Sequence, residues 1–261
     1  NSSSPALTLS NDVMRSEVYG IPPKSDQKPG DFPLGQCIND TTIVTPFGTG
    51  CWNLFFTAEP AHDEVISHPD SNDTRMQQVW YAQDRVWGAL DTVVKVNGQE
   101  RAGIAYFVVK ANVEHGSVHA DIDEQGYVAL KNNNVTYPAI AVLPNGKGIM
   151  AFSLMGQDYH PSAAYVTIKN KKSFSDIHVA AAGLGVDDGF TSYKAFVGDP
   201  PRTRWGDYGA AVTDGNNVWF ASEYIGQTCT LEEYLTGSIG SCGGTRTALA
   251  NWGTRISGVK P

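Results

Sequence analysis

The residue types most able to do chemistry gather in one short stretch of the chain, between positions 202 and 226. Its first part combines two guanidinium groups, two aromatic rings and a carboxylate, supplied by Arg202, Arg204, Trp205, Asp207 and Tyr208. A strand that serves only a core does not need so many charges. The two arginines are suited to hold an anionic ligand bidentately, with Trp205 beside it, or to pair with nearby aspartates as structure. Both alternatives stay open.

A second acidic group ends this stretch. Glu223 follows the largely apolar strand segment Val218–Ser222 and stands next to Tyr224. A carboxyl at such a position is a candidate general acid or base. The candidate catalytic residues are therefore Glu223, Tyr208 and Asp207, and the alternative for Glu223 is a plain hydrogen-bonded carboxylate.

A recurring motif indicates a third possible site. Asp31, Thr136 and Asp207 each precede an aromatic residue and then Pro or Gly. If these residues begin equivalent inner strands, their side chains converge on one axis. Carboxylate oxygens of Asp31 and Asp207 could then bind Ca²⁺. The alternative is that each side chain hydrogen-bonds to a neighbouring backbone.

Four cysteines form two local pairs, Cys37 with Cys51 and Cys229 with Cys242. Each pair would close a loop of about a dozen residues, a constraint that stabilises a fold by about 3 kcal/mol. The alternatives are free thiols or, with less support from the spacing, metal ligands. The chain also has glycosylation sequons at Asn1, Asn39, Asn72 and Asn134. Together, disulfides and sequons favour a secreted, extracellular glycoprotein.

Composition limits the fold and the partners. The 261 residues include 27 Gly and 14 Pro, and only 18% are charged, which is typical of strands and turns. The net charge of −8, with no long basic run, argues against nucleic acid as a partner. No apolar run approaches the ~20 residues of a membrane span. The chain has no signal peptide and does not begin with Met, so we expect a processed chain or a piece of a larger precursor.

The elements that must position these residues are strands. Thr213–Asn216 reads as a tight turn between two strands, Trp205–Val212 and Asn217–Tyr224. Asn97-Gly98 marks another hairpin turn. Further strands are expected throughout, among them Met14–Tyr19 and Tyr127–Leu130, and no long amphipathic helix is expected.

Internal similarity predicts an all-β fold of the β-propeller class with about three four-stranded blades. Ala139–Val142 corresponds to Ala210–Val212, and Ile149–Ser153 to Val218–Ser222. Val86–Leu90 is aligned with Asn251–Arg255 as third strands. The predicted units are an arm, 1–30, with strands that complete a neighbouring blade, and blades at 31–115, 116–185 and 186–261. A β-sandwich with accidental similarities is the alternative.

The Trp205–Tyr208 motif, Trp-Gly-Asp-Tyr, and the Asn134–Ala139 motif, Asn-Val-Thr-Tyr-Pro-Ala, carry a resemblance to a known family. The chain resembles the C-terminal half of an uncharacterised family of secreted β-propeller proteins with sialidase-like repeats, from soil bacteria and fungi. The resemblance covers most of 31–261 and implies a longer parent. The chain departs from sialidases in one respect: Gly116–Val128 lacks the spacing of their Asp-box turn.

Two functions follow as expectations. The first is a binding or assembly scaffold, and the second is a carbohydrate-active enzyme, sialidase-like, with its site at the channel face. Three blades cannot close alone, since propellers use at least four. A second polypeptide should therefore complete the ring. The N-terminal half of the same precursor is the favoured partner, and a homodimer is the alternative.

Overall fold

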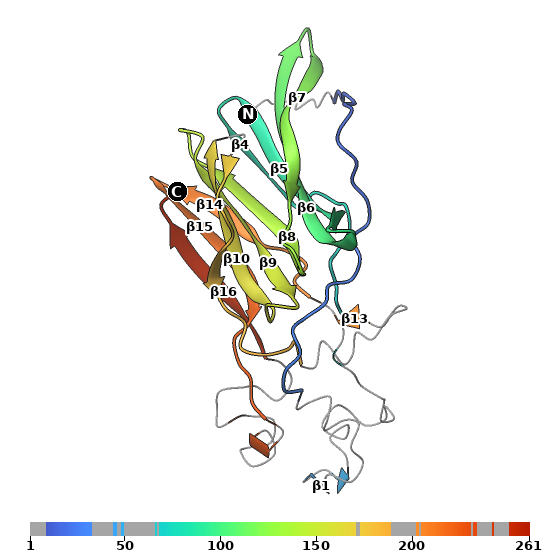
Figure 1. Ribbon diagram of the computed structural model, residues 1–261. Coiled ribbons are helices and arrows are strands. Elements are labelled where there is room, and N and C mark those ends of the chain that lie inside the picture. Colours follow the sequence, from blue (N-terminus) through green and yellow to red (C-terminus); the bar gives the residue numbers. More distant parts are fainter. Residues whose placement is uncertain are drawn as a thin grey trace.

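The computed structural model in Figure 1 describes residues 9–32, 44–45, 48–49, 66, 68–170, 173–188, 202–203, 205–230, 232–233, 242 and 251–261. For 44–45, 48–49 and 202–203 it describes the backbone alone. Three antiparallel sheets follow one another along the chain. The predicted all-β class is confirmed for this part of the chain.

The first sheet has the strand order β4-β5-β6-β7. Its strands are β4 Gln78–Ala82, β5 Arg85–Val96, β6 Gln99–Glu114 and β7 Ser117–Val128. Asn97 and Gly98 join β5 to β6 with φ of 51° and 83°, as expected for a two-residue hairpin turn with positive φ at both positions. The sheet ends at Val128, so the predicted division of the chain at 115/116 falls inside it, and Tyr127 closes this sheet instead of opening the next.

The first two strands of the second sheet are buried on both faces. It comprises β8 Asn133–Val142, β9 Gly148–Gly156, β10 Ser162–Asn170, β11 Ser173–Phe174 and β12 His178–Ala181. Every residue of β8 and β9 is buried. Continuous apolar runs such as Ile149–Phe152 reflect this position, because neither face of β8 and β9 meets water.

The third sheet has the order β14-β15-β16, from Ala210–Asp214, Asn217–Ile225 and Trp252–Val259. Two short pairs complete the described strands. They are β1 Val44–Thr45 with β2 Gly48–Thr49, and β3 His68–Pro69 with β13 Arg202–Thr203 in parallel.

The sheets stack face to face in chain order, with the second in the middle (Figure 1). Between the first and second sheets, Trp87 and Tyr106 pack with Ile140 and Phe152. Between the second and third, Ala139, Ala141 and Ile149 pack with Ala211 and Phe220. The burial of these apolar faces is the main force that holds the three sheets together.

The first strands of the three sheets meet. The Trp80 indole N–H of β4 donates to the Val142 carbonyl of β8 at 2.7 Å. The Gln78 side chain of β4 bonds both backbone groups of Ala211 in β14, donating at 2.7 Å and accepting at 3.2 Å. These side chains bond to backbone groups of β8 and β14, which are edge strands without a neighbouring strand on one side.

The N-terminal arm, 9–32, contains no strand. It lies along the first sheet of its own chain, where Figure 1 draws it in blue beside β6 and β7. The Tyr127 hydroxyl donates to the Val18 carbonyl, and Gly20 exchanges hydrogen bonds with Thr92 and Val93 of β5. The predicted strand at Met14–Tyr19 is therefore wrong: this backbone bonds mainly to side chains and not to a ladder.

The registers of the three sheets correct the predicted repeat alignment. Counting from each hairpin, with the Leu143–Lys147 backbone hydrogen bond as the first pair of the second sheet, the pair Trp80–Trp87 corresponds to Ala141–Ile149 and to Val212–Trp219. Ile149 is thus equivalent to Trp219, one residue beyond the predicted match. Val86–Leu90 lies in a second strand and Trp252–Arg255 in a third, so the alignment of these two segments is also wrong.

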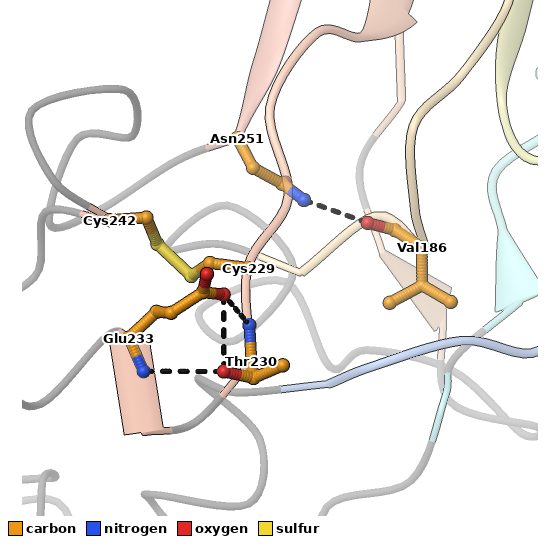
Figure 2. The surroundings of a disulfide bond; sticks show 6 residues. All are labelled: Val186, Cys229, Thr230, Glu233, Cys242 and Asn251. Atoms are coloured by element: carbon orange, nitrogen blue, oxygen red, sulfur yellow. Dashed lines mark hydrogen bonds between the residues drawn. A yellow bond between two sulfur atoms is a disulfide. The ribbon is translucent and has the colours of Figure 1, made fainter.

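Cys229 and Cys242 form a disulfide, as predicted (Figure 2). Beside it, Thr230 and Glu233 form a reciprocal capping box. The Glu233 carboxylate accepts from the Thr230 amide at 2.8 Å, and the Glu233 amide donates to the Thr230 hydroxyl at 3.3 Å. Cys37 and Cys51 lie outside the described residues.

Asn251 anchors the start of β16. The side-chain N–H of Asn251 donates to the Val186 carbonyl at 2.8 Å, as Figure 2 shows. Its side-chain oxygen accepts from the Asp188 backbone amide at 3.2 Å. The Gly226 amide donates to the Asn251 carbonyl. The end of β15 and the segment after the second sheet are therefore both held at this one buried residue.

Candidate functional site

The loop that precedes β14 has an unusual backbone. Gly206 and Asp207 have φ of 63° and 90°. The Asp207 amide donates back to the Trp205 carbonyl at 3.1 Å, which closes a turn around Gly206. Glycine adopts such a φ without steric cost. Residues Trp205–Gly209 are therefore a tight loop, and the predicted strand Trp205–Val212 begins only at Ala210.

Trp205 fixes this loop to the second sheet. Its ring is buried with Tyr137, Met155 and Ile225, and its indole N–H donates to the Ser153 hydroxyl at 3.1 Å. A Cβ at Gly206 would lie 3.2 Å from the Tyr137 ring. Trp205 was predicted to bind a ligand, but its ring and its N–H are both engaged in packing the two sheets.

Glu223 reaches the loop from β15. Its Oε2 accepts a hydrogen bond from the Gly206 amide at 2.5 Å. Burial, followed by the nearby negative charge of Asp187, raises the pKa of Glu223 to about 7, although the Gly206 bond lowers it. A carboxyl with this pKa exchanges its proton near neutral pH, which suits a general acid or base.

A pocket of about 400 Å³ opens beside Glu223. Two aromatic side chains on its wall, Tyr208 and Trp252, are largely exposed. Ser222 also lines it, and the buried Ser222 hydroxyl makes no hydrogen bond within the described part of the chain. Exposed rings beside a carboxyl are able to hold a polar ligand with apolar faces.

The structure thus brings together all three predicted catalytic residues. Asp207, Tyr208 and Glu223 all line this pocket. Arg202 is described only as backbone, in β13, and Arg204 lies outside the described residues.

The proposed metal residues are not arranged as predicted. Thr136 lies fully buried in β8, and Asp207 lies in the loop before β14. Asp31 and Phe32 belong to the arm and to no strand. Just before them, the arm lies beside the segment that follows the second sheet, where Gln27 accepts from the Asp187 amide at 2.8 Å. Among the described residues, no group of three His, Cys, Asp or Glu side chains could hold a metal ion.

One relationship escaped the sequence reading. Two residues beyond the matched alanines Ala89, Ala151 and Ala221, the second strands carry Asp91, Ser153 and Glu223. In each case the side chain accepts a hydrogen bond from a segment that begins a sheet. The donors are the Tyr137 amide to Asp91 at 2.7 Å, the Trp205 indole to Ser153 and the Gly206 amide to Glu223. The shared Trp-x-Ala-x-acid pattern of Trp87–Asp91 and Trp219–Glu223 is a signal that could have found it.

Two of these three positions are sealed by the following sheet. Burial raises the pKa of Asp91 well above its ordinary value. Ser153 is likewise buried. Of the three side chains, only that of Glu223 is partly exposed to solvent, because no described sheet follows the third one.

The predicted glycosylation sites differ in access. Asn134 is buried in β8, and its side-chain oxygen accepts from the Ala102 amide at 3.1 Å. A glycan does not fit there in the folded chain, so Asn134 is not a usable site once the chain has folded. Asn72 is half-buried, and Asn1 and Asn39 lie outside the described residues.

Within the described part of the chain, no helix has the length and apolar character needed to cross a membrane. Comparison with protein-family models, curated proteins and solved structures finds no match for this chain.

Proposed function

We propose that this chain is part of a secreted β-propeller glycoprotein that acts as a binding or assembly scaffold. The three described sheets are taken as its blades. In support, each is an antiparallel meander in chain order, the sheets stack face to face, and the first strands β4, β8 and β14 meet. The Cys229–Cys242 disulfide supports an oxidising compartment.

The observation that carries the scaffold proposal is a change in exposure at equivalent positions. Trp87 and Ile149 are 0% exposed, whereas the equivalent Trp219 is 44% exposed. Tyr137 is 4% exposed under the next sheet, whereas the equivalent Tyr208 is 79% exposed. The third sheet therefore presents to solvent the face that the first two sheets bury.

A bare sheet face with large apolar residues marks a contact for another molecule. We propose that a second polypeptide covers it and completes the propeller. This partner is either the N-terminal half of a common precursor or a second copy of the chain.

Sedimentation velocity of the purified chain tests the scaffold proposal. An assembly larger than the 28.1 kDa chain is the expected result. A stable, folded monomer of 28.1 kDa that shows no association over a wide concentration range would overturn it.

The second candidate is a carbohydrate-active enzyme, and one specific observation favours it. Glu223, with a pKa of about 7, lines the same pocket as the exposed rings of Tyr208 and Trp252. In this reading the rings stack on sugar faces and protonated Glu223 donates to a glycosidic oxygen, with Asp207 as the second carboxylate.

Hydrolysis assays on a panel of glycosides separate the two candidates. The enzyme predicts turnover that falls above about pH 7, as Glu223 ionises, and that is lost in Glu223→Gln. Asp214→Asn, at the hairpin of the same sheet, is the control that should keep full activity. If the wild-type chain hydrolyses none of the glycosides, the enzyme proposal is contradicted and the scaffold proposal stands.

A further inference from the structure

Two faces of the molecule matter for assembly. The third-sheet face is the outer face of β14-β15-β16, with Val212, Trp219, Ile256 and Glu223. The first-sheet face is the outer face of β4-β5-β6-β7, with Val79 and Tyr81. Within the chain, the equivalents of these two faces already pack against each other twice: between the first and second sheets, and between the second and third.

The internal contacts show what belongs on each face. Val79 is equivalent to Ile140 and Ala211, which pack onto the preceding sheet and are 1% and 4% exposed. Val79 itself is 55% exposed because no described sheet precedes it. The first-sheet face therefore has the positions that dock onto a preceding sheet, and the third-sheet face has the positions that receive a following one.

We propose that the third-sheet face of one copy of this chain docks on the first-sheet face of a second copy, head to tail. This inference rests on the proposed scaffold function and names its partner. On the first-sheet face the contact would be made through β4, where Val79 and Tyr81 are exposed, and it would extend the stacking of the first sheet on the second and of the second on the third. Two such contacts would close a ring of two copies.

The arm leaves only β4 of the first-sheet face open for this contact. Its part up to Gly20 lies on β5, β6 and β7, where Tyr19 makes an edge-to-face contact with Phe107 at 6.1 Å between ring centres. The outward residues Leu90, Ala105 and Phe107 of β5 and β6 are already buried within the chain. On β4, Val79 and Tyr81 stay exposed. β4 itself makes the internal side-chain contacts between first strands, through Trp80 to β8 and Gln78 to β14.

Equivalence also predicts where Glu223 lies. Asp91 and Ser153 accept hydrogen bonds from the segment that begins the next sheet. In the assembled form, the residues just before β4 of the second copy would cover Glu223 and Tyr208. The pocket beside Glu223 would then be an interface cavity between copies.

Charged substitutions on each face test this arrangement. Trp219→Glu alters the third-sheet face and Val79→Glu the first-sheet face; Val113→Glu, at the exposed tip of the β6–β7 hairpin, is the control. Circular dichroism checks that each variant folds. Ile256→Glu is a second variant of the third-sheet face, to be used if Trp219→Glu does not fold. Sedimentation should give a dimer of twice 28.1 kDa for the wild type and the control. Each face variant alone should dissociate at least about 30-fold more readily.

Mixing the two face variants gives the decisive result. A Trp219→Glu copy keeps an intact first-sheet face, and a Val79→Glu copy keeps an intact third-sheet face. Their 1:1 mixture should therefore form a dimer through one intact contact, although each is monomeric alone.

Three results would overturn the inference. A mixture that remains monomeric, or a dimer that survives Val79→Glu but not Trp219→Glu, rules out the head-to-tail contact while the scaffold function stands. A folded monomeric wild type overturns both.

Discussion

Glu223 is a carboxyl whose ionisation opposes folding. Its pKa in the folded chain, about 7, is above the ordinary 4.5, so the folded state keeps a proton that the unfolded state has lost between these values. The free energy of unfolding should therefore fall as pH rises from about 4.5 to about 7.

Thermal unfolding at pH 5 and pH 8 checks this prediction. Glu223→Gln, which cannot ionise, should lose less stability than the wild type between these two pH values. Glu114→Gln, at the exposed end of β6, is the control and should behave as the wild type. An unchanged pH dependence in Glu223→Gln would show that the carboxyl is not ionising in this range.

Asp91 is the residue of the first sheet that is equivalent to Glu223, and it is fully buried. Burial raises its pKa, and Oδ1 accepts from the Tyr137 amide at 2.7 Å. Asparagine offers the same acceptor without the charge, so Asp91→Asn should change stability little near neutral pH.

Asp91→Ala removes the acceptor and should cost about 1–3 kcal/mol, because the Tyr137 amide stays buried and unbonded. Urea unfolding of the two variants gives the comparison. Equal losses in both variants would argue that Asp91 is charged in the folded chain, contrary to this account.

At the scale of elements, the loop Trp205–Gly209 sets the site. Gly206→Ala places a Cβ at 3.2 Å from the Tyr137 ring at a φ of 63°. Gly215→Ala is the matched control, with a φ of 58° and no atom within 4 Å of its added Cβ.

Both substitutions place a Cβ at a positive φ, a backbone conformation that residues other than glycine adopt at a steric cost of about 1 kcal/mol in the folded chain. Only Gly206→Ala also displaces Tyr137, so its loss in chemical denaturation should be the larger. Equal losses would mean that the loop moves away from Tyr137 without cost.

Much of the element pattern could be predicted from the sequence. The hairpin β14–β15, its Asp-Gly-Asn turn and the all-β class follow from alternation and turn residues. The gathering of Asp207, Tyr208 and Glu223 was also accessible, because all three lie close together along one hairpin.

The register that relates the strands of the three sheets could not be predicted as well from the sequence. A slip of one residue, such as Ile149 against Val218 instead of Trp219, leaves the apolar pattern plausible but transfers every side chain to the other face. The backbone of Gly206 and Asp207 was also missed, because their positive φ goes with contacts to residues far away in the sequence: Gly206 lies against the Tyr137 ring, and the Gln77 side chain donates to the Asp207 carbonyl.

At the scale of the molecule, the central claim is that the third-sheet face is covered in the assembled protein. The chain buries the equivalent faces of its first two sheets and exposes Val212, Trp219 and Ile256 on the third. A repeated contact that stops at an apolar face indicates that another sheet is expected there.

Hydroxyl-radical footprinting of the wild type, compared with the dissociated Val79→Glu variant, tests this claim most directly. Trp87, buried within the chain, gives the reference rate for a covered ring. The account predicts that Trp219 and Tyr208 are oxidised several-fold more slowly in the wild type than in the variant, with Trp219 close to Trp87. Equal oxidation of Trp219 in both samples, at a rate far above that of Trp87, would contradict it.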